Sequence, residues 1–471
     1  ANTGIGDNAL VANTSGGSNV AIGANALDAN TTASYNVGVG RNALGANLTG
    51  TNNVAVGYDA LLTATTVSNN TAIGKDTLKV ATAGSNVAVG RYALRYSTNA
   101  SNNIAVGYNS LGANTTGERN TAIGGYALDG NTTATDCTAV GYSALTAANT
   151  GGSNTAIGAN ALQNNTSGYY GVGLGRYALY SNTTGHSNSA VGNNALYSNT
   201  TASNNTAFGQ SALQQNTTGA NNTAVGANVL DANTTGEFNT AVGRLALSGN
   251  TTGGRNTAFG GQTLDANTTG QYNTALGFNS LTTNIDGSNN TAVGKDALAL
   301  STVSDNTAVG YQAGDAVTTG QENTFIGKSS GGGTNTGRSN VATGYETFLN
   351  NTTGSYNTAL GYEALRGNTT ANSNTAVGVS ALRANTTGSM NAAVGAYSLD
   401  ANQTGSGNTC LGYNAGTAFT SDGLTAVGKD ALELCTTGVN TAVGGNALAA
   451  VTTGTGNTAV GQDALTLNTG G

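Results

Sequence analysis

Apolar residues recur in two columns at fixed distances from a repeating glycine. This glycine occurs 28 times, from Gly6 to Gly461, and 23 of the 27 intervals are 17 residues long, the other four being 16. The residue before it is Val, Ile, Leu or Phe in 27 units, and the fourth residue after it is Leu in 24. We therefore predict two core columns, represented by Ile22, Val56, Val225, Leu27, Leu61 and Leu230.

The segment that ends in the glycine predicts a short β-strand. Its consensus Asn-Thr-Ala-Val-Gly alternates with a period of two, and Asn, Thr, Gly and Val are poor helix formers. Because Val replaces Thr in units such as those of Val20 and Val54, we expect the Thr and Val positions to face inward. The outer face would then be a smooth stripe of Ala and Gly, which a second sheet should cover.

A unit of 16 to 17 residues cannot enclose its own core and must stack on its neighbours. The expected fold is all-β, a parallel β-solenoid or β-roll of 28 coils in one rod, on the order of 130 Å long at the usual strand spacing. Residues 1–471 would be a single repeat domain of consensus x-x-Asn-Thr-Ala-Val-Gly-x-x-Ala-Leu-x-x-Asn-Thr-Thr-Gly without separate caps. Since both terminal units carry the apolar columns, we expect each end to need a neighbour, in a longer protein or a filament of stacked copies.

Glycine interrupts the Leu column at Gly314, Gly331 and Gly416. Each interruption removes a buried side chain worth roughly 2 to 3 kcal/mol. We therefore expect the two consecutive weak units, residues 305–337, to be the softest part of the chain.

The composition leaves little material for catalysis or metal binding. Charged residues make up 8% of the chain, the net charge is −7, and no run of either sign occurs, so neither nucleic acid nor an anionic membrane is an expected partner. No apolar run reaches the roughly 18 residues that span a bilayer. His186 is the only histidine, and the three cysteines occupy different repeat positions, so we predict no catalytic, cofactor or metal site and no enzyme activity.

Three short patterns resemble functional motifs but have better structural explanations. Gly327-Lys328-Ser329 has Glu322 where a phosphate loop needs glycine. Aspartates recur in only some units, unlike those of calcium-binding rolls. Many Asn-x-Thr triplets match the glycosylation sequon, yet the same residues suit the corners of a coil.

Tyrosine is the large residue that the variable positions use most, with 19 copies. Those directly after the repeat glycine should face outward, either as solvated residues or as platforms that stack on sugars or on a neighbouring fibre. These candidate contact residues are Tyr58, Tyr108, Tyr142, Tyr311, Tyr345, Tyr362 and Tyr413.

Segments such as Asn86-Val87-Ala88-Val89-Gly90 and Asn154-Thr155-Ala156-Ile157-Gly158 resemble the Ser-Val-Ala-Ile-Gly repeats of trimeric autotransporter adhesin heads, and also repeat regions of bacteriophage tail fibres. The adhesin resemblance implies a left-handed parallel β-roll in which three chains form an extracellular, ligand-binding rod. The general rule for parallel crossovers favours the right-handed sense instead, so both hands stay open.

Together these features favour a structural or adhesive extracellular fibre at a cell surface, in a filament or on a virion. The expected partner is the chain itself, as a homotrimer or end-to-end polymer, with glycans or a host surface as ligands and no membrane span. One alternative is a phage tail-fibre shaft. Another is an ice- or surface-binding solenoid, which needs a flat outward Thr ladder that inward-facing threonines would not supply.

Overall fold

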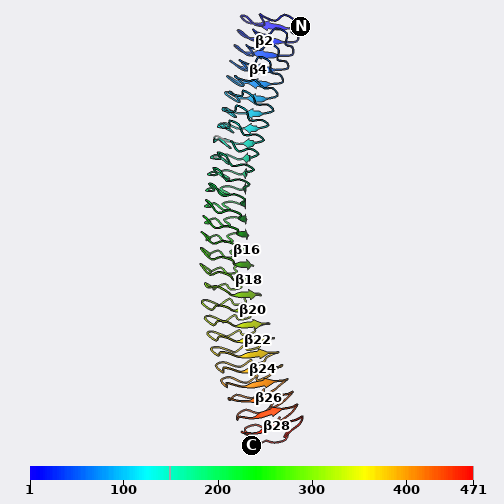
Figure 1. Ribbon diagram of the computed structural model, residues 1–471, viewed down its shortest axis with the longest axis vertical. Coiled ribbons are helices and arrows are strands. Elements are labelled where there is room, and N and C mark those ends of the chain that lie inside the picture. The colour runs from blue at the N-terminus through cyan, green and yellow to red at the C-terminus, as the bar shows by residue number, and fades with distance from the viewer. Residues whose placement is uncertain (148–149, 470–471) are drawn as a thin grey trace. The chain divides into compact units, whose positions relative to one another are not determined.

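The computed structural model describes residues 1–147 and 150–469, and the chain forms two compact units, Ala1–Glu237 and Phe238–Gly471. Each unit is a stack of coils in which every coil contributes one three-residue strand to a parallel sheet (Figure 1). This confirms the predicted all-β, parallel β-solenoid. The strands of the first unit are β1 (Thr3–Ile5), β2 (Val20–Ile22), β3 (Val37–Val39), β4 (Val54–Val56), β5 (Thr71–Ile73), β6 (Val87–Val89), β7 (Ile104–Val106), β8 (Thr121–Ile123), β9 (Thr138–Val140), β10 (Thr155–Ile157), β11 (Val172–Leu174), β12 (Ser189–Val191), β13 (Thr206–Phe208) and β14 (Thr223–Val225).

The second unit repeats the arrangement of the first. Its strands are β15 (Thr240–Val242), β16 (Thr257–Phe259), β17 (Thr274–Leu276), β18 (Thr291–Val293), β19 (Thr307–Val309), β20 (Thr324–Ile326), β21 (Val341–Thr343), β22 (Thr358–Leu360), β23 (Thr375–Val377), β24 (Ala392–Val394), β25 (Thr409–Leu411), β26 (Thr425–Val427), β27 (Thr441–Val443) and β28 (Thr458–Val460).

Within each unit, each strand pairs in register with the equivalent residues of the next coil, as Ala207 of β13 does with Ala224 of β14. The glycine after each strand is what lets the coils approach this closely. Gly23 has a φ of 130°, and a Cβ placed on it would lie 2.7 Å from the carbonyl carbon of Gly40 in the next coil. Any side chain here would therefore separate the coils, which explains why the repeat keeps this glycine in every unit.

The predicted orientation of the strands is wrong. Ala, the middle residue, is fully buried in strand after strand, whereas Ile22 and Val225 are 38% and 37% exposed and Val56 is partly exposed. These three residues are therefore not core residues. The reason is the narrow interior: a Cβ on Gly38, at the middle position of β3, would already lie 3.5 Å from Cδ1 of Leu27. Only a small side chain fits between the strand and the Leu column.

The Leu column is confirmed as core, because Leu27, Leu61 and Leu230 are fully buried. These leucines have left-handed backbone angles, with φ of 52° at Leu27 and 50° at Leu230. Among the described non-glycine residues with positive φ there is no Val, Ile or Thr. A β-branched side chain clashes with the backbone in this conformation. This explains why the column holds Leu and never Val, Ile or Thr.

Two ladders of buried asparagines line the corners of the coils. In the first, Asn36 accepts a hydrogen bond at Oδ1 from the backbone N–H of Asn53, 3.0 Å away, and donates through Nδ2 to the carbonyl of Gly50 at 2.8 Å. In the second, Asn47 donates to Asn30 Oδ1 and to the same Gly50 carbonyl, both at 3.1 Å. Each bond contributes about 1 kcal/mol net, and the ladders satisfy groups that would otherwise be buried without partners.

The four short coils all interrupt the second ladder. All of them lack its asparagine and have another residue in its place, and all are one residue shorter in the Thr-Thr-Gly corner that follows. In a full coil the carbonyl from this corner accepts the asparagine amide, as Gly50 does for Asn47. A shortened corner thus occurs only in coils without the ladder asparagine, although full-length coils such as that of Ala64 also lack it. The replacing residues are Ala81, Ser301, Phe419 and Cys435.

The core is refilled where Leu is replaced by glycine, which the sequence analysis did not foresee. Phe325 occupies the middle position of β20, where other strands have Ala, and is fully buried. A Cβ on Gly314 would lie 2.8 Å from Cδ2 of this ring, and a Cβ on Gly331 would overlap the ring's other edge. The Phe325 ring thus occupies part of the space that leucines at both positions would take. It offsets part of the predicted loss of buried side chains, and the softness of residues 305–337 stays a prediction.

A second repair surrounds Gly416. A Cβ on this glycine would lie 2.8 Å from both Cys410 Sγ and Leu424 Cδ2. Cys410 replaces the Ala of β25, Leu424 replaces an asparagine of the first ladder, and Phe419 replaces one of the second. All three side chains are buried. The lost leucine is again compensated by larger neighbours.

Candidate interaction surfaces

The inverted strands turn one face of the sheet toward solvent. We call it the outward sheet face, and it consists of the first and third residues of every strand. None of these residues is buried in any of the 28 strands, and none is Asp, Glu, Lys, Arg or His. The first position is Thr in 19 strands, and the third is Val, Ile, Leu or Phe in 27. This face was not predicted, because the first and third residues of each strand were expected to face inward.

The face is level except where larger side chains replace Val. Phe208 of β13 is 53% exposed and Phe259 of β16 is 55% exposed. Leu360 and Leu411 are each 48% exposed. These large apolar side chains project from the sheet, and water contacts about half of their surface.

The seven tyrosines predicted to face outward do so, with exposed fractions from 38% at Tyr345 to 60% at Tyr142. Several contact each other from coil to coil. Tyr345 and Tyr362 are stacked with ring centroids 5.4 Å apart, whereas Tyr108 and Tyr142 each meet Tyr126 edge to face. The rings therefore form short aromatic runs beside the sheet, which is a geometry that suits flat apolar ligands.

Cations share the column of these tyrosines. Eight of the chain's 15 basic residues directly follow the repeat glycine. Most lie against local partners: Lys75 Nζ is 5.4 Å from the centre of the Tyr58 ring, and Lys295 Nζ lies 3.2 Å from Asp296 Oδ2. Such exposed pairs contribute little to stability, but they make the column polar and positively charged. The eight residues are Arg41, Lys75, Arg91, Arg176, Arg244, Lys295, Lys328 and Lys429.

Hydrogen bonds to arginine tune two of the tyrosines next to this column. Arg91 donates to the Tyr92 hydroxyl at 2.7 Å, and this bond lowers the pKa of Tyr92. Arg176 does the same to Tyr177, whose pKa is also lowered. In Tyr126, by contrast, removal from water raises the pKa. These shifts are local and bring no acid and base together.

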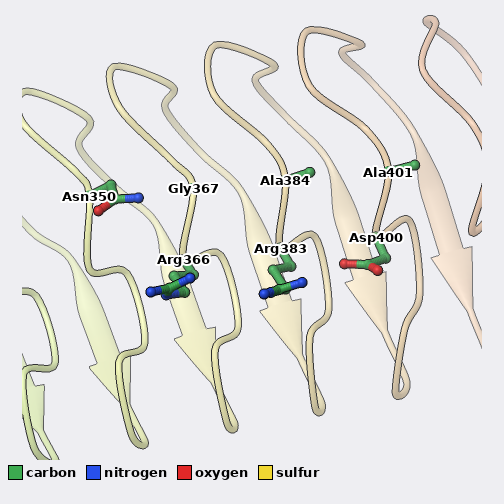
Figure 2. Close-up of a pocket in the computed structure, with 7 residues that line it drawn as sticks. All are labelled: Asn350, Arg366, Gly367, Arg383, Ala384, Asp400 and Ala401. Atoms are coloured by element: carbon green, nitrogen blue, oxygen red, sulfur yellow. The ribbon is translucent and has the colours of Figure 1, made fainter.

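A shallow groove of about 280 Å³ crosses four successive coils of the second unit (Figure 2). Arg366, Arg383 and Asp400 occupy the same repeat position in three of these coils and follow one another along the groove. Arg366 pairs with Glu346 at 3.0 Å and Arg383 with Glu363 at 2.7 Å. Burial raises the pKa of Asp400. The carboxylates of Glu346 and Glu363 thus neutralise the two guanidinium groups. The groove is lined by Asn350, Arg366, Gly367, Arg383, Ala384, Asp400 and Ala401.

The residues of the motif-like patterns, the single histidine and the cysteines make only local contacts. Lys328 follows β20 and lies over the Tyr345 ring at 5.2 Å, and His186 stacks on Tyr169 with centroids 4.9 Å apart. Cys410 and Cys435 are separate buried thiols, and burial raises the pKa of Cys410 to about 12, which keeps it protonated and unreactive. Within residues 1–147 and 150–469, no group of three or more His, Cys, Asp and Glu side chains is placed to hold a metal ion.

No protein-family model matches this chain, and a search of curated proteins finds no match. In the part of the chain that the structure describes, no helix has the length and apolar character needed to cross a membrane.

Proposed function

We propose that this protein is a structural or adhesive extracellular fibre protein rather than an enzyme, acting at a cell surface, in a filament or as the shaft of a tail fibre. The observation that carries the proposal is the uniformity of the stacks. In both units the same Leu and Ala columns and the same asparagine ladders connect equivalent residues of successive coils. The residues that vary most lie in exposed columns, where a fibre meets its surroundings.

Location tests this proposal directly. Antibodies raised against the 471-residue chain would be applied to intact, unpermeabilised source cells and to purified virions, and detected by immunogold electron microscopy. We expect gold particles along filaments outside the cell or along virion fibres, which also separates the two kinds of fibre. Gold particles found only in permeabilised cells would contradict the proposal.

A second candidate, an ice- or crystal-binding surface, is favoured by one specific observation. The Thr column of the strands faces solvent, with Thr240 and Thr375 among its exposed members. A flat array of outward threonines at the strand spacing of about 4.8 Å is the geometry that such a function needs. A thermal-hysteresis assay on the purified chain tests it: a freezing point depressed below the melting point supports ice binding, and coincident values exclude it.

A further inference from the structure

The outward sheet face has the properties of an interface between copies of this chain. We propose that it packs against the same face of a second copy, with the two stacks running in the same direction. The inference rests on the proposed fibre function, because it names how fibre subunits associate. It starts from a face that carries no charged residue in any strand, although its two flanks hold many.

The apolar side chains of the face are too large and too regular to be incidental. Phe208 and Phe259 are each more than half exposed, and the Val and Ile residues around them continue the apolar column through every coil but that of Thr343. Soluble proteins rarely expose contiguous apolar patches larger than a few hundred Å² unless a partner covers them. Burial against a partner gives these side chains the environment that the narrow core denies them.

The area is sufficient for a stable interface. The fourteen strands of the first unit, at about 4.8 Å each, form a face about 67 Å long and about 10 Å wide, or about 670 Å². A standard interface buries about 800 Å² on each partner. The face of either unit alone lies within the usual range around this value.

The repeat distance favours a second copy over any other protein. Hydrogen-bonded strands fix the rise per coil, so every copy presents its columns at the same spacing of about 4.8 Å. Two such faces stay in step along their whole length, and their side chains interdigitate as in packed sheets about 10 Å apart. A flat ice lattice fits less well, because Phe208 and Phe259 stand above the neighbouring Val residues and would hold it away.

Charged residues determine the relative direction of the two stacks. We call the residues just before a strand its leading flank and those just after it its trailing flank. β20 is preceded by Glu322 and followed by Lys328, and β26 is preceded by Asp422 and followed by Lys429. The Lys429 side chain is 71% exposed and also lies 3.2 Å from Asp430 Oδ2 of its own chain, so β20 has the clearer charge contrast. A twofold axis parallel to the stack brings the leading flank of each strand beside the trailing flank of the same strand in the other copy. Acid then meets base at both strands, whereas antiparallel stacks would place like flanks together.

Strands that follow a basic residue are also compatible with two stacks that run in the same direction. β16 is preceded by Arg255 and followed by Gly260 and Gly261, and β21 is preceded by Arg338 and followed by Gly344 and Tyr345. In the same-direction pair these arginines meet glycine or tyrosine rather than another cation. The arrangement thus avoids a like-charge contact at both of these strands.

Light scattering on the purified full chain tests the pairing. We expect a mass twice the 46.1 kDa of one chain. The double variant Val106→Lys/Phe208→Lys places two charges on the face without touching the core, and its measured mass should halve. The matched control, Gln163→Lys/Gln215→Lys, adds the same charges away from the sheet and should leave the mass doubled. A monomeric or trimeric wild-type chain, or a double variant that remains a dimer, would overturn the inference.

Cross-linking tests the direction and does not depend on the lysine variants folding. In the same-direction pair the first position of a strand lies opposite the third position of the same strand in the other copy. Chains carrying Thr121→Cys mixed with chains carrying Ile123→Cys should form disulfide-linked dimers across β8 upon mild oxidation, while each variant alone cross-links less. Equal, low cross-linking in the mixture and in the separate variants would exclude this direction.

The two proposals fail in different ways. A monomeric chain that immunogold labelling nevertheless finds in extracellular filaments would overturn the paired face and leave the fibre function standing. A dimer that labelling finds only inside cells would do the reverse. Thermal hysteresis in a monomeric wild-type chain, lost in Val106→Lys/Phe208→Lys but kept in Gln163→Lys/Gln215→Lys, would assign the face to ice instead.

Discussion

The regular coils around Asn199 and Asn216 and the irregular coils around Phe325 reach the same packing by different means. In the first, every interior position holds its consensus residue, and the asparagine ladder runs from coil to coil. In the second, two leucines are missing, and Ser301 and Thr334 interrupt the ladder with hydroxyl oxygens that have no hydrogen-bond partner. Phe325 fills the interior that the missing leucines leave.

The difference shows that a side chain from a neighbouring coil can occupy interior space that a missing leucine leaves. A stack of coils passes its packing from one layer to the next, so a void in one coil is open to a side chain from its neighbour. Polar ladders behave differently, because an interrupted ladder leaves an unpaired group that no neighbour repairs. Asn47, Asn284 and Asn402 each end a run of the second ladder, and each has an Oδ1 atom without a hydrogen-bond partner.

The largest expected effect comes from Phe325→Ala. Because this fully buried ring lies against both Gly314 and Gly331, its removal should cost about 3 to 5 kcal/mol of local stability. Hydrogen exchange is the appropriate measurement, since a stack of repeats need not unfold in one step. Amides of residues 307–337 should exchange faster while those around Asn216 stay protected.

A rescue variant sharpens this test. Gly314 and Gly331 have φ of 58° and 65°, close to the values of the core leucines, so Leu can occupy both positions once the ring is gone. The triple variant Phe325→Ala/Gly314→Leu/Gly331→Leu should recover most of the lost protection. If it stays as unprotected as Phe325→Ala, the idea of shared volume is wrong.

Asn216→Ala should break the regular region with a smaller effect. Its amide donates to Asn199 Oδ1 at 3.0 Å and to the Gly219 carbonyl at 2.9 Å, and its own Oδ1 accepts from Asn233. Removing the amide leaves the buried Asn199 Oδ1 without this donor, while the Gly219 carbonyl keeps the Asn205 amide, and the cost should be about 2 to 3 kcal/mol. Urea denaturation followed by circular dichroism should show the loss, and the exposed neighbour Gln215→Ala should not. Equal stabilities for the two variants would mean that the ladder contributes nothing.

The smallest effect should be a gain, from Ala64→Asn. Asn47 Oδ1 has no donor because the next coil has Ala64 in the ladder position. This coil keeps its full length, and its Val67 carbonyl already accepts Asn53 as the corner carbonyls of the regular coils do. The new amide should donate to Asn47 and raise stability by about 1 kcal/mol. The same substitution at Ala81, in a coil with a shortened corner, should give no gain.

The repeat length, the parallel coils and the Leu column could all be predicted from the sequence. Regular spacing of glycine and apolar residues leaves only a stack of short strands, and Leu27 and Leu61 lie where the pattern put them. The exposure of Tyr58 and its equivalents could also be predicted, because a position that accepts Tyr, Arg, Gly or Ala cannot be part of a narrow core.

The orientation of the strand could have been predicted but was not. Hydrophobicity pointed to Val56 and Val225, whereas the residue with the least freedom is the Ala between the two outward positions, present in 23 of 28 strands. Constant small size marks a confined interior, and variation among Thr, Val, Leu and Phe marks an open surface. The role of Phe325 could not be read from its own unit, because it depends on glycines in two coils.

The left-handed backbone positions give the coil a property that concerns its evolution. A chain that slipped by one residue so that the strand Val took the place of the repeat glycine would put a β-branched residue where φ is near 130°, so this slip is rejected. A slip of 17 residues, however, returns each residue to an equivalent site in a full coil. Insertion or loss of whole units in the gene therefore changes the number of coils without disturbing those that remain. Length can vary in such a protein while every layer keeps its structure.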